Sequence, residues 1–245
     1  MGLLPDFSKR SERLELMDDL SIQGDELEET LVQLERINAL TRGPTISIAG
    51  IESLLPPGVE ELSVLDVGSG AGDIPRRVVD WADSRDLSVS IKGIDLSRTT
   101  VEIARARAKK ARGHAARTTR QKRMEFELKN LFDLPDTDRY DIVHASLVLH
   151  HFPGETAVEA LAKMHRLSRY GVIINDLQRH PLPWLGLRLG LLVLTRNRLI
   201  QNDGPLSVLR GFTRRELLDL GQRAGIETPS VAWEFPFRWL MVCPG

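Results

Sequence analysis

The sequence is poor in cysteine. Its one cysteine, Cys243, excludes an intramolecular disulfide and a zinc site built from several thiolates. Long hydrophobic runs are missing too, because none reaches the roughly 18 apolar residues that a transmembrane helix requires. The segment from Met1 to Arg10 has only a short apolar patch and lacks the hydrophobic core of a signal peptide. Together these absences predict a cytoplasmic location.

An excess of charge of one sign is also absent. The 245 residues include 33 basic and 34 acidic side chains and have a net charge of −1, so the chain as a whole does not attract polyanions. One dense basic run extends from Arg105 to Arg123 and contains no Phe, Trp or Tyr on which a base could stack. We interpret this run as a solvated helix face and loop, and an RNA-binding patch is the alternative.

One segment has glycine at every second position. Val64 to Val67 predicts a short buried strand, and Gly68, Gly70 and Gly72 predict a turn with unusual backbone angles that lets a ligand touch the main chain. A helix with Pro75 near its first position follows. A strand, a glycine turn and a helix in this order are typical of the ligand-binding corner of an open α/β sheet.

The spacing of the glycines argues against two common nucleotide sites. A dinucleotide fingerprint would need a third glycine where Asp73 stands, and no Gly-Lys-Ser/Thr of a P-loop follows. The pattern Asp-x-Gly-x-Gly-x-Gly resembles that of class I methyltransferases, which depend on S-adenosylmethionine (SAM). The resemblance implies that Asp66 holds the methionine ammonium group and that Gly68 to Gly72 form the floor under the methionine and the ribose.

The next two predicted strands each end in a polar residue. The strand over Val89 to Ile94 ends at Asp95, whose carboxylate can accept hydrogen bonds from both ribose hydroxyls. After the strand over Met124 to Leu128 comes Asn130, at a place where the family usually has an acidic residue that binds the adenine amino group. An amide oxygen can also accept that hydrogen bond. The resemblance assigns four further residues to the cofactor site: Ser69, Leu96, Leu131 and Ala145.

A second block, from Asp141 to Phe152, predicts a buried strand that enters a loop at the carboxyl edge of the sheet. Its pattern Asp-x-Val-x-x-x-x-Val-Leu-His-His resembles ubiquinone/menaquinone-type and natural-product methyltransferases, in which this loop lines the space between sulfonium and acceptor. His150 or His151 is therefore a candidate general base, because imidazole titrates near neutral pH. Structural hydrogen bonding is the alternative, and without a tight ligand spacing we expect no metal site.

The fifth predicted strand, Gly171 to Leu177, brings Asp176 to the same crevice as the two histidines. Asp176 is the alternative proton acceptor or a residue that orients the acceptor, unless it only caps the following turn.

Residues 1–58 predict a helical extension ahead of the sheet. A short helix and a loop come first, then a helix that Asp25 caps and Gly43-Pro44 ends, and then a helix over Ile46 to Leu55. The excess of acidic residues in this extension disfavours contact with nucleic acid. In small-molecule methyltransferases such helices often cover the acceptor pocket, and a layer that serves only stability or dimerisation is the alternative.

The segment of about 178–212 is rich in leucine and contains Trp184, but it is too short and too charged to span a bilayer. It lies where methyltransferases commonly insert an acceptor-binding lid, and its apolar character predicts a greasy or aromatic acceptor. A core helix and interfacial contact with lipid are the alternatives. A turn is predicted at Asp203-Gly204-Pro205, and two closing strands are predicted at Ser230–Phe235 and Arg238–Val242.

We therefore expect an α/β protein with a Rossmann-like seven-stranded class I methyltransferase sheet over 59–245, with the extension over 1–58 and the lid. The resemblance implies SAM-dependent methylation of a small apolar or aromatic acceptor, most directly O-methylation of a phenolic, pyrone or polyketide-type hydroxyl in natural-product biosynthesis. C-methylation of a quinone-like ring, RNA methylation through the basic run, and SAM binding without catalysis are the alternatives. No nucleic-acid partner and no membrane span are expected, and homodimerisation is left open.

Overall fold

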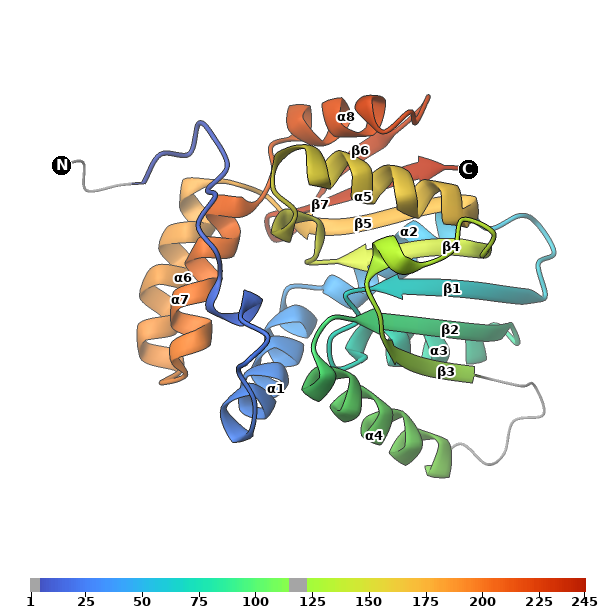
Figure 1. Ribbon diagram of the computed structural model, residues 1–245, viewed down its shortest axis with the longest axis horizontal. Helices are drawn as coiled ribbons and strands as arrows, with labels where there is room; N and C mark the ends of the chain where they lie inside the picture. The colour runs from blue at the N-terminus through green and yellow to red at the C-terminus, as the bar shows by residue number, and fades with distance from the viewer. Residues whose placement is uncertain (1–4, 115–122) are drawn as a thin grey trace.

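The computed structural model describes residues 5–114 and 123–245. Its centre is a seven-stranded sheet in the order β3-β2-β1-β4-β5-β7-β6 (Figure 1). The strands are β1 (Glu61–Val67), β2 (Ser88–Asp95), β3 (Arg123–Leu128), β4 (Tyr140–Ser146), β5 (Ser168–Leu177), β6 (Ser230–Glu234) and β7 (Arg238–Pro244). The strands β1 to β5 pair in parallel, whereas β7 is antiparallel to both of its neighbours. The predicted Rossmann-like sheet of seven strands is therefore confirmed.

Helices cover both faces of this sheet and bury two hydrophobic cores. Successive side chains of β1 point to opposite faces, so Leu65 and Val67 belong to one core and Val64 belongs to the other. The first core includes residues of α5 and α8, and the second includes residues of α2, α3 and α4. These helices are α2 (Gly43–Leu54), α3 (Asp73–Asp83), α4 (Arg98–His114), α5 (Gly154–Leu167) and α8 (Arg214–Arg223).

Three more helices lie beyond the edge of the sheet to which the arrows of β1 and β4 point (Figure 1). They are α1 (Asp25–Leu40), α6 (Pro181–Leu194) and α7 (Arg198–Arg210), and the last two pack together as a hairpin. The segment predicted as a lid therefore forms two helices at the carboxyl edge, where open α/β sheets bind their ligands.

Residues 5–20, which we call the strap, run mostly as extended chain along α6 and α7 (Figure 1). One 3₁₀ turn, Leu16–Asp18, replaces the short helix that the sequence predicts. The backbone N–H groups of Leu16 and Met17 donate to the two carboxylate oxygens of Asp203, at 2.8 and 3.0 Å. Hydrogen bonds to α7 thus satisfy donors that a helix would have satisfied within itself.

Two predicted helix boundaries are wrong by a few residues. The N-cap of α1 is Gly24, and Asp25 is the first residue of the helix. Gly43-Pro44 begins α2 instead of ending α1, because Arg42 adopts a left-handed conformation with φ 59° and separates the two helices. Proline is well suited to the first turn of a helix, whose N–H groups have no partner within the helix.

The turn predicted at Asp203-Gly204-Pro205 is also wrong, because all three residues lie inside α7. Proline inside a helix removes one backbone hydrogen bond. Here the helix continues because Leu206 and Val208 are buried and the carboxylate of Asp203 holds the strap. Tertiary contacts therefore outweigh the local preference of the sequence.

The basic run begins on α4. The guanidinium of Arg105 donates to the carbonyl oxygen of Phe126 at 2.8 Å, and that of Arg107 pairs with Glu35 at 2.8 Å. Two of its cations therefore have partners within the molecule. The part of the run at 115–122 lies outside the described residues.

Candidate functional site

The glycine turn after β1 has the backbone angles that its sequence predicts. Gly68, Gly70 and Gly72 all have positive φ, at 63°, 52° and 75°. A Cβ atom on Gly68 would lie 2.4 Å from Val148, so this glycine lets the turn touch the loop after β4. A Cβ atom on Gly70 would meet no atom within 4 Å. The turn is therefore closed toward the β4 loop at Gly68 and open at Gly70.

The carboxylate of Asp95 lies against this turn. One of its oxygens accepts from the backbone N–H of Gly70 at 3.0 Å, and the other accepts from Ser97 at 2.9 Å. Burial raises the pKa of Asp95, which the two backbone donors partly offset. The end of β2 and the glycine turn thus form one corner, with the side chain of Leu96 half exposed beside it. The ribose contact of Asp95 stays a prediction.

The other predicted cofactor residues are less exposed to solvent. Leu131 and Ala145 are buried in the core on the α5 face, and Asn130 caps a 3₁₀ turn by accepting from the N–H of Phe132 at 3.1 Å. Among the described residues, the buried hydroxyl oxygens of Ser69 and Ser146 have no hydrogen-bond partner. Buried hydroxyls without a partner are uncommon, so this corner fits a ligand with polar groups such as SAM.

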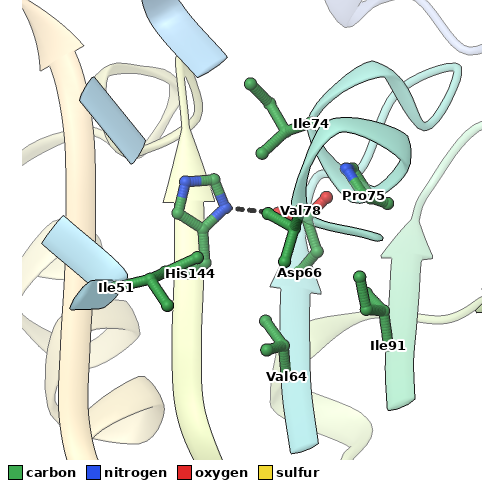
Figure 2. A pocket seen from close by; sticks show the side chains of 8 residues that line it. All are labelled: Ile51, Val64, Asp66, Ile74, Pro75, Val78, Ile91 and His144. Carbon is green, nitrogen blue, oxygen red and sulfur yellow. Dashed lines mark hydrogen bonds and ion pairs between the residues drawn. The ribbon is translucent and has the colours of Figure 1, made fainter. Parts of the chain in front are cut away.

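Asp66 points away from this corner, to the face of the sheet that α2 and α3 cover. Figure 2 shows its carboxylate directed at His144, and the two groups lie 2.6 Å apart. The other nitrogen of His144 lies 2.8 Å from the hydroxyl of Ser47 on α2. A small pocket under α3 adjoins the pair (Figure 2), and six apolar residues complete its lining: Ile51, Val64, Ile74, Pro75, Val78 and Ile91. Burial raises the pKa of Asp66, and its contact with a methionine ammonium group stays a prediction.

The hydrogen bonds continue from Ser47 to the N-terminal helices. The amide of Asn175 donates to Ser47 at 3.0 Å and accepts from Arg238 at 3.1 Å. Arg238 in turn donates to Asn38 on α1 at 2.8 Å, and Asn38 donates to Asp73, the first residue of α3, at 2.7 Å. Burial lowers the pKa of Arg238 to about 10. We call these seven hydrogen-bonded residues the inner network: Asp66, His144, Ser47, Asn175, Arg238, Asn38 and Asp73. The network connects α1 and α2 to the end of the glycine turn.

The structure brings His150 and Asp176 together, as the sequence analysis expects. The Nδ1 atom of His150 lies 2.6 Å from one oxygen of Asp176, and the backbone N–H of His150 donates to the other at 3.1 Å. Both side chains are buried. Burial alone would lower the pKa of His150, but the carboxylates of Asp176 and Glu15 outweigh it and raise the pKa to about 9. His150 is therefore held as a cation at neutral pH.

Two acidic residues of the strap complete this group, and the sequence analysis missed both. Glu15 lies 3.5 Å from Nε2 of His150 and 4.0 Å from Nε2 of His151. Asp18 lies 2.7 Å from Nδ1 of His151 and accepts from Arg210 at 2.7 Å. We call these six residues the edge cluster: Glu15, Asp18, His150, His151, Asp176 and Arg210.

No local signal points to Glu15 or Asp18. His151 and Asp18 are 133 residues apart in the sequence, and the strap reads there as an ordinary charged segment. The hydrogen bond between them forms because the strap is bound to α7.

One oxygen of Glu15 is buried without a hydrogen-bond partner among the described residues. It lies 3.5 Å from His150 and 3.7 Å from the guanidinium of Arg210. Burial would raise the pKa of Glu15, but the adjacent His150 outweighs it and lowers the pKa. Glu15 is thus an ionised acceptor with an unused lone pair.

The donor atoms of Glu15, His150 and His151 lie within 4.8 Å of one another, so this group could hold a metal ion. The sequence analysis expects no metal because it considers only spacing along the chain. The guanidinium of Arg210 lies 3.7 Å from Glu15, and this fixed positive charge disfavours a metal ion beside it. The arrangement suits proton handling better than metal binding.

Two residues of the predicted lid, Trp184 and Leu182, are not members of the edge cluster. Trp184 packs edge-on against Phe7 of the strap, with ring centroids 6.0 Å apart, and Leu182 is 61% exposed.

Comparison with known proteins places these observations in context. Residues 64–171 match a protein family described as "Methyltransferase domain". The ubiquinone biosynthesis O-methyltransferase of Candida albicans mitochondria is 30% identical over 125 residues, which are 50% of this chain and 35% of that protein. The chain thus spans about a third of the length of that curated relative.

Solved structures show the same fold at low identity. The magnesium protoporphyrin IX methyltransferase of Synechocystis, solved with bound SAH, is 16% identical with a TM-score of 0.55, over 94% of this chain and 93% of that one. A SAM-dependent methyltransferase of Aquifex aeolicus is 16% identical with a TM-score of 0.60, over 90% of this chain and 98% of that one.

Proposed function

We propose that this chain, whose residues 64–171 match a methyltransferase domain, is a class I SAM-dependent methyltransferase that methylates a hydroxyl group of a small apolar or aromatic acceptor, of phenolic, pyrone or polyketide type. The observation that carries this proposal is the pair of carboxylate-held histidines, which begins two residues after Val148 in the loop that touches the glycine turn. When bound, SAM supplies an electrophilic methyl group on a sulfonium.

The cofactor would be held by the corner between β1 and β2. The turn from Gly68 to Gly72 offers main-chain contact, and Asp95 offers a carboxylate already fixed against that turn. The free hydroxyls of Ser69 and Ser146 would gain partners there. Asp66, which already bonds His144, remains the proposed holder of the ammonium group.

Methylation of a hydroxyl requires that its oxygen lose a proton as the bond to the methyl carbon forms. The edge cluster offers two histidines with different exposure. His150 is buried and cationic, so it has no lone pair to offer, whereas the side chain of His151 is 32% exposed. In the neutral tautomer that donates from Nδ1 to Asp18, the lone pair of His151 is on Nε2. We therefore assign proton acceptance to His151, and a positioning role to His150 and Asp176.

The RNA alternative receives less support, because Arg105 and Arg107 already have partners within the chain. C-methylation of a quinone-like ring and binding of SAM without catalysis differ from the proposal in what they predict for His151. A non-catalytic protein would bind SAM but methylate no acceptor, whether or not this imidazole is present.

Isotope-labelled SAM and a panel of phenols, pyrones and quinols would test the proposal by mass shift of the product. His151→Gln should lower kcat by roughly 10²–10⁴-fold, the usual contribution of a general base, and should leave SAM binding unchanged. His165→Gln is the matched control, because His165 lies on α5 and contacts the carbonyl of Pro244. Equal turnover by the two variants would contradict the assignment of His151, and no labelled product from any acceptor would contradict the activity.

A further inference from the structure

The outer side of α6 is an unusually exposed apolar surface. Four residues at intervals of three and four form a stripe along this helix, with exposed fractions of 61% for Leu182, 44% for Leu185, 58% for Leu189 and 87% for Val193. We call these four residues the α6 stripe. A soluble monomer rarely leaves so large an apolar group in contact with water unless it meets a partner.

The other side of α6 faces the protein. Leu191 is buried, and a Cβ atom on Gly204 of α7 would lie 2.7 Å from it. In the described part of the chain, α7 is the element against which α6 mainly packs. The α6–α7 hairpin also extends away from the sheet (Figure 1). The stripe is therefore not a portion of the core that happens to reach the surface.

The charges carried by the α6 segment itself have one sign. The sequence has no Asp or Glu between Asp176 and Asp203. Arg188 and Arg196 are both exposed within this interval. An apolar helix face bordered by cationic side chains is typical of helices that lie in the interface of a membrane with anionic lipids. Two copies of this basic surface would repel each other, so a second copy of the chain is a poorer partner.

We propose that the α6 stripe docks on an anionic lipid surface, with Arg188 and Arg196 facing the lipid headgroups. The helix would lie on the bilayer, and no helix within the described residues is long and apolar enough to cross one. Trp184 lies on the same helix, and its ring packs against Phe7 of the strap. The strap also brings Glu15 and Asp18 to the edge cluster. Docking would therefore bring the bilayer close to the strap. This inference goes beyond the proposed function and does not depend on it.

Co-sedimentation of the full chain with vesicles tests the docking. Vesicles of phosphatidylcholine mixed with phosphatidylglycerol should bind the protein, vesicles of phosphatidylcholine alone should bind it less, and added salt should reduce the difference. The double variant Leu189→Glu, Val193→Glu should bind mixed vesicles at least about tenfold more weakly, since each buried leucine is worth about a factor of ten. Arg188→Gln with Arg196→Gln should lose only the preference for anionic vesicles.

Leu40→Glu is the matched control, because Leu40 is 82% exposed on α1, outside the stripe. Equal vesicle binding by this control and the double variant would overturn the proposal, and so would failure of the unaltered protein to bind mixed vesicles. A dimer of the unaltered protein that dissociates in the double variant would show that the stripe covers a second copy instead. Methyl transfer to a soluble phenol without vesicles reports on the proposed function separately.

Discussion

The inner network and the edge cluster use the same residue types for different purposes. Each centres on a buried histidine whose Nδ1 atom lies 2.6 Å from a buried aspartate, His144 with Asp66 and His150 with Asp176. In the inner network the second nitrogen of His144 meets a neutral hydroxyl, that of Ser47. In the edge cluster the second nitrogen of His150 faces another carboxylate.

This difference gives the two histidines different electrostatic surroundings, because His144 lies between a carboxylate and a hydroxyl whereas His150 lies between two carboxylates. The inner network runs from one hydrogen-bonded partner to the next and joins α1, α2 and α3 to the sheet. The edge cluster combines three carboxylates with cationic partners, leaves an oxygen of Glu15 without a hydrogen bond, and exposes the side chain of His151. Among the described residues each site has one buried polar atom without a hydrogen bond, Nε of Arg238 and an oxygen of Glu15. Only the edge cluster has such an atom beside a partly exposed imidazole, which makes it the candidate for ligand contact and proton transfer.

The largest effect should come from removing one carboxylate of each pair. Asp176→Asn leaves the His150 cation without its closest counter-charge and should lower the free energy of unfolding by roughly 3–5 kcal/mol, as for a broken buried ion pair. Asp66→Asn keeps a hydrogen-bond acceptor beside His144 and should cost about 1–3 kcal/mol. Urea unfolding of both variants measures the two values. Equal losses would break the distinction between the two sites.

The pH dependence of stability sharpens the same comparison. The folded pKa of His150 is about 9 and its ordinary value is 6.5, so its stabilising contribution is complete below pH 6.5 and is lost as the pH rises to 9. The unaltered protein should lose about 3 kcal/mol of unfolding free energy over this interval. Asp176→Asn should lose much less unfolding free energy over this interval. The difference between the two profiles cancels the contributions of the other groups that titrate there. Parallel profiles for the two proteins would contradict the cationic state of His150.

The smallest effect concerns the glycine turn above the inner network. Gly70→Ala and Gly58→Ala place the same methyl group at positive φ, 52° and 75°, where neither meets an atom within 4 Å. Each should cost about 1–2 kcal/mol of stability, the cost of a left-handed conformation. Gly70→Ala alone should also weaken SAM binding in calorimetry, because its methyl group enters the proposed cofactor space. Equal SAM affinity in the two variants would move the cofactor away from this turn.

Much of the fold could be predicted because its signals are local. Closely spaced glycines permit the positive φ of a tight turn, and a short apolar run before such a turn favours a buried strand. The same holds for the strand that ends at Asp95 and for the block that leads to His150 and His151. These patterns are sufficient to predict the sheet, and the cofactor corner and the region of the acceptor stay predictions.

Other features depend on residues distant in the sequence. Asp203 holds the strap, so Leu16 to Asp18 form a single turn, and buried neighbours keep Pro205 inside α7. Asp66 faces His144 because β1 pairs with β4, a contact that glycine spacing does not reveal.

The sequence by itself determined the glycine turn, the strands beside it and the two histidines, because backbone angles and hydrophobic periodicity are set by neighbouring residues. The sequence also predicted that Asp176 lies near the two histidines, but only the tertiary structure decided that Glu15 and Asp18 join them. Asp176 arrives on the adjacent strand, whereas Glu15 and Asp18 arrive on the strap. Hydrogen bonds and burial depend on distances in space, and folding brings the strap to His151 across 133 residues of chain.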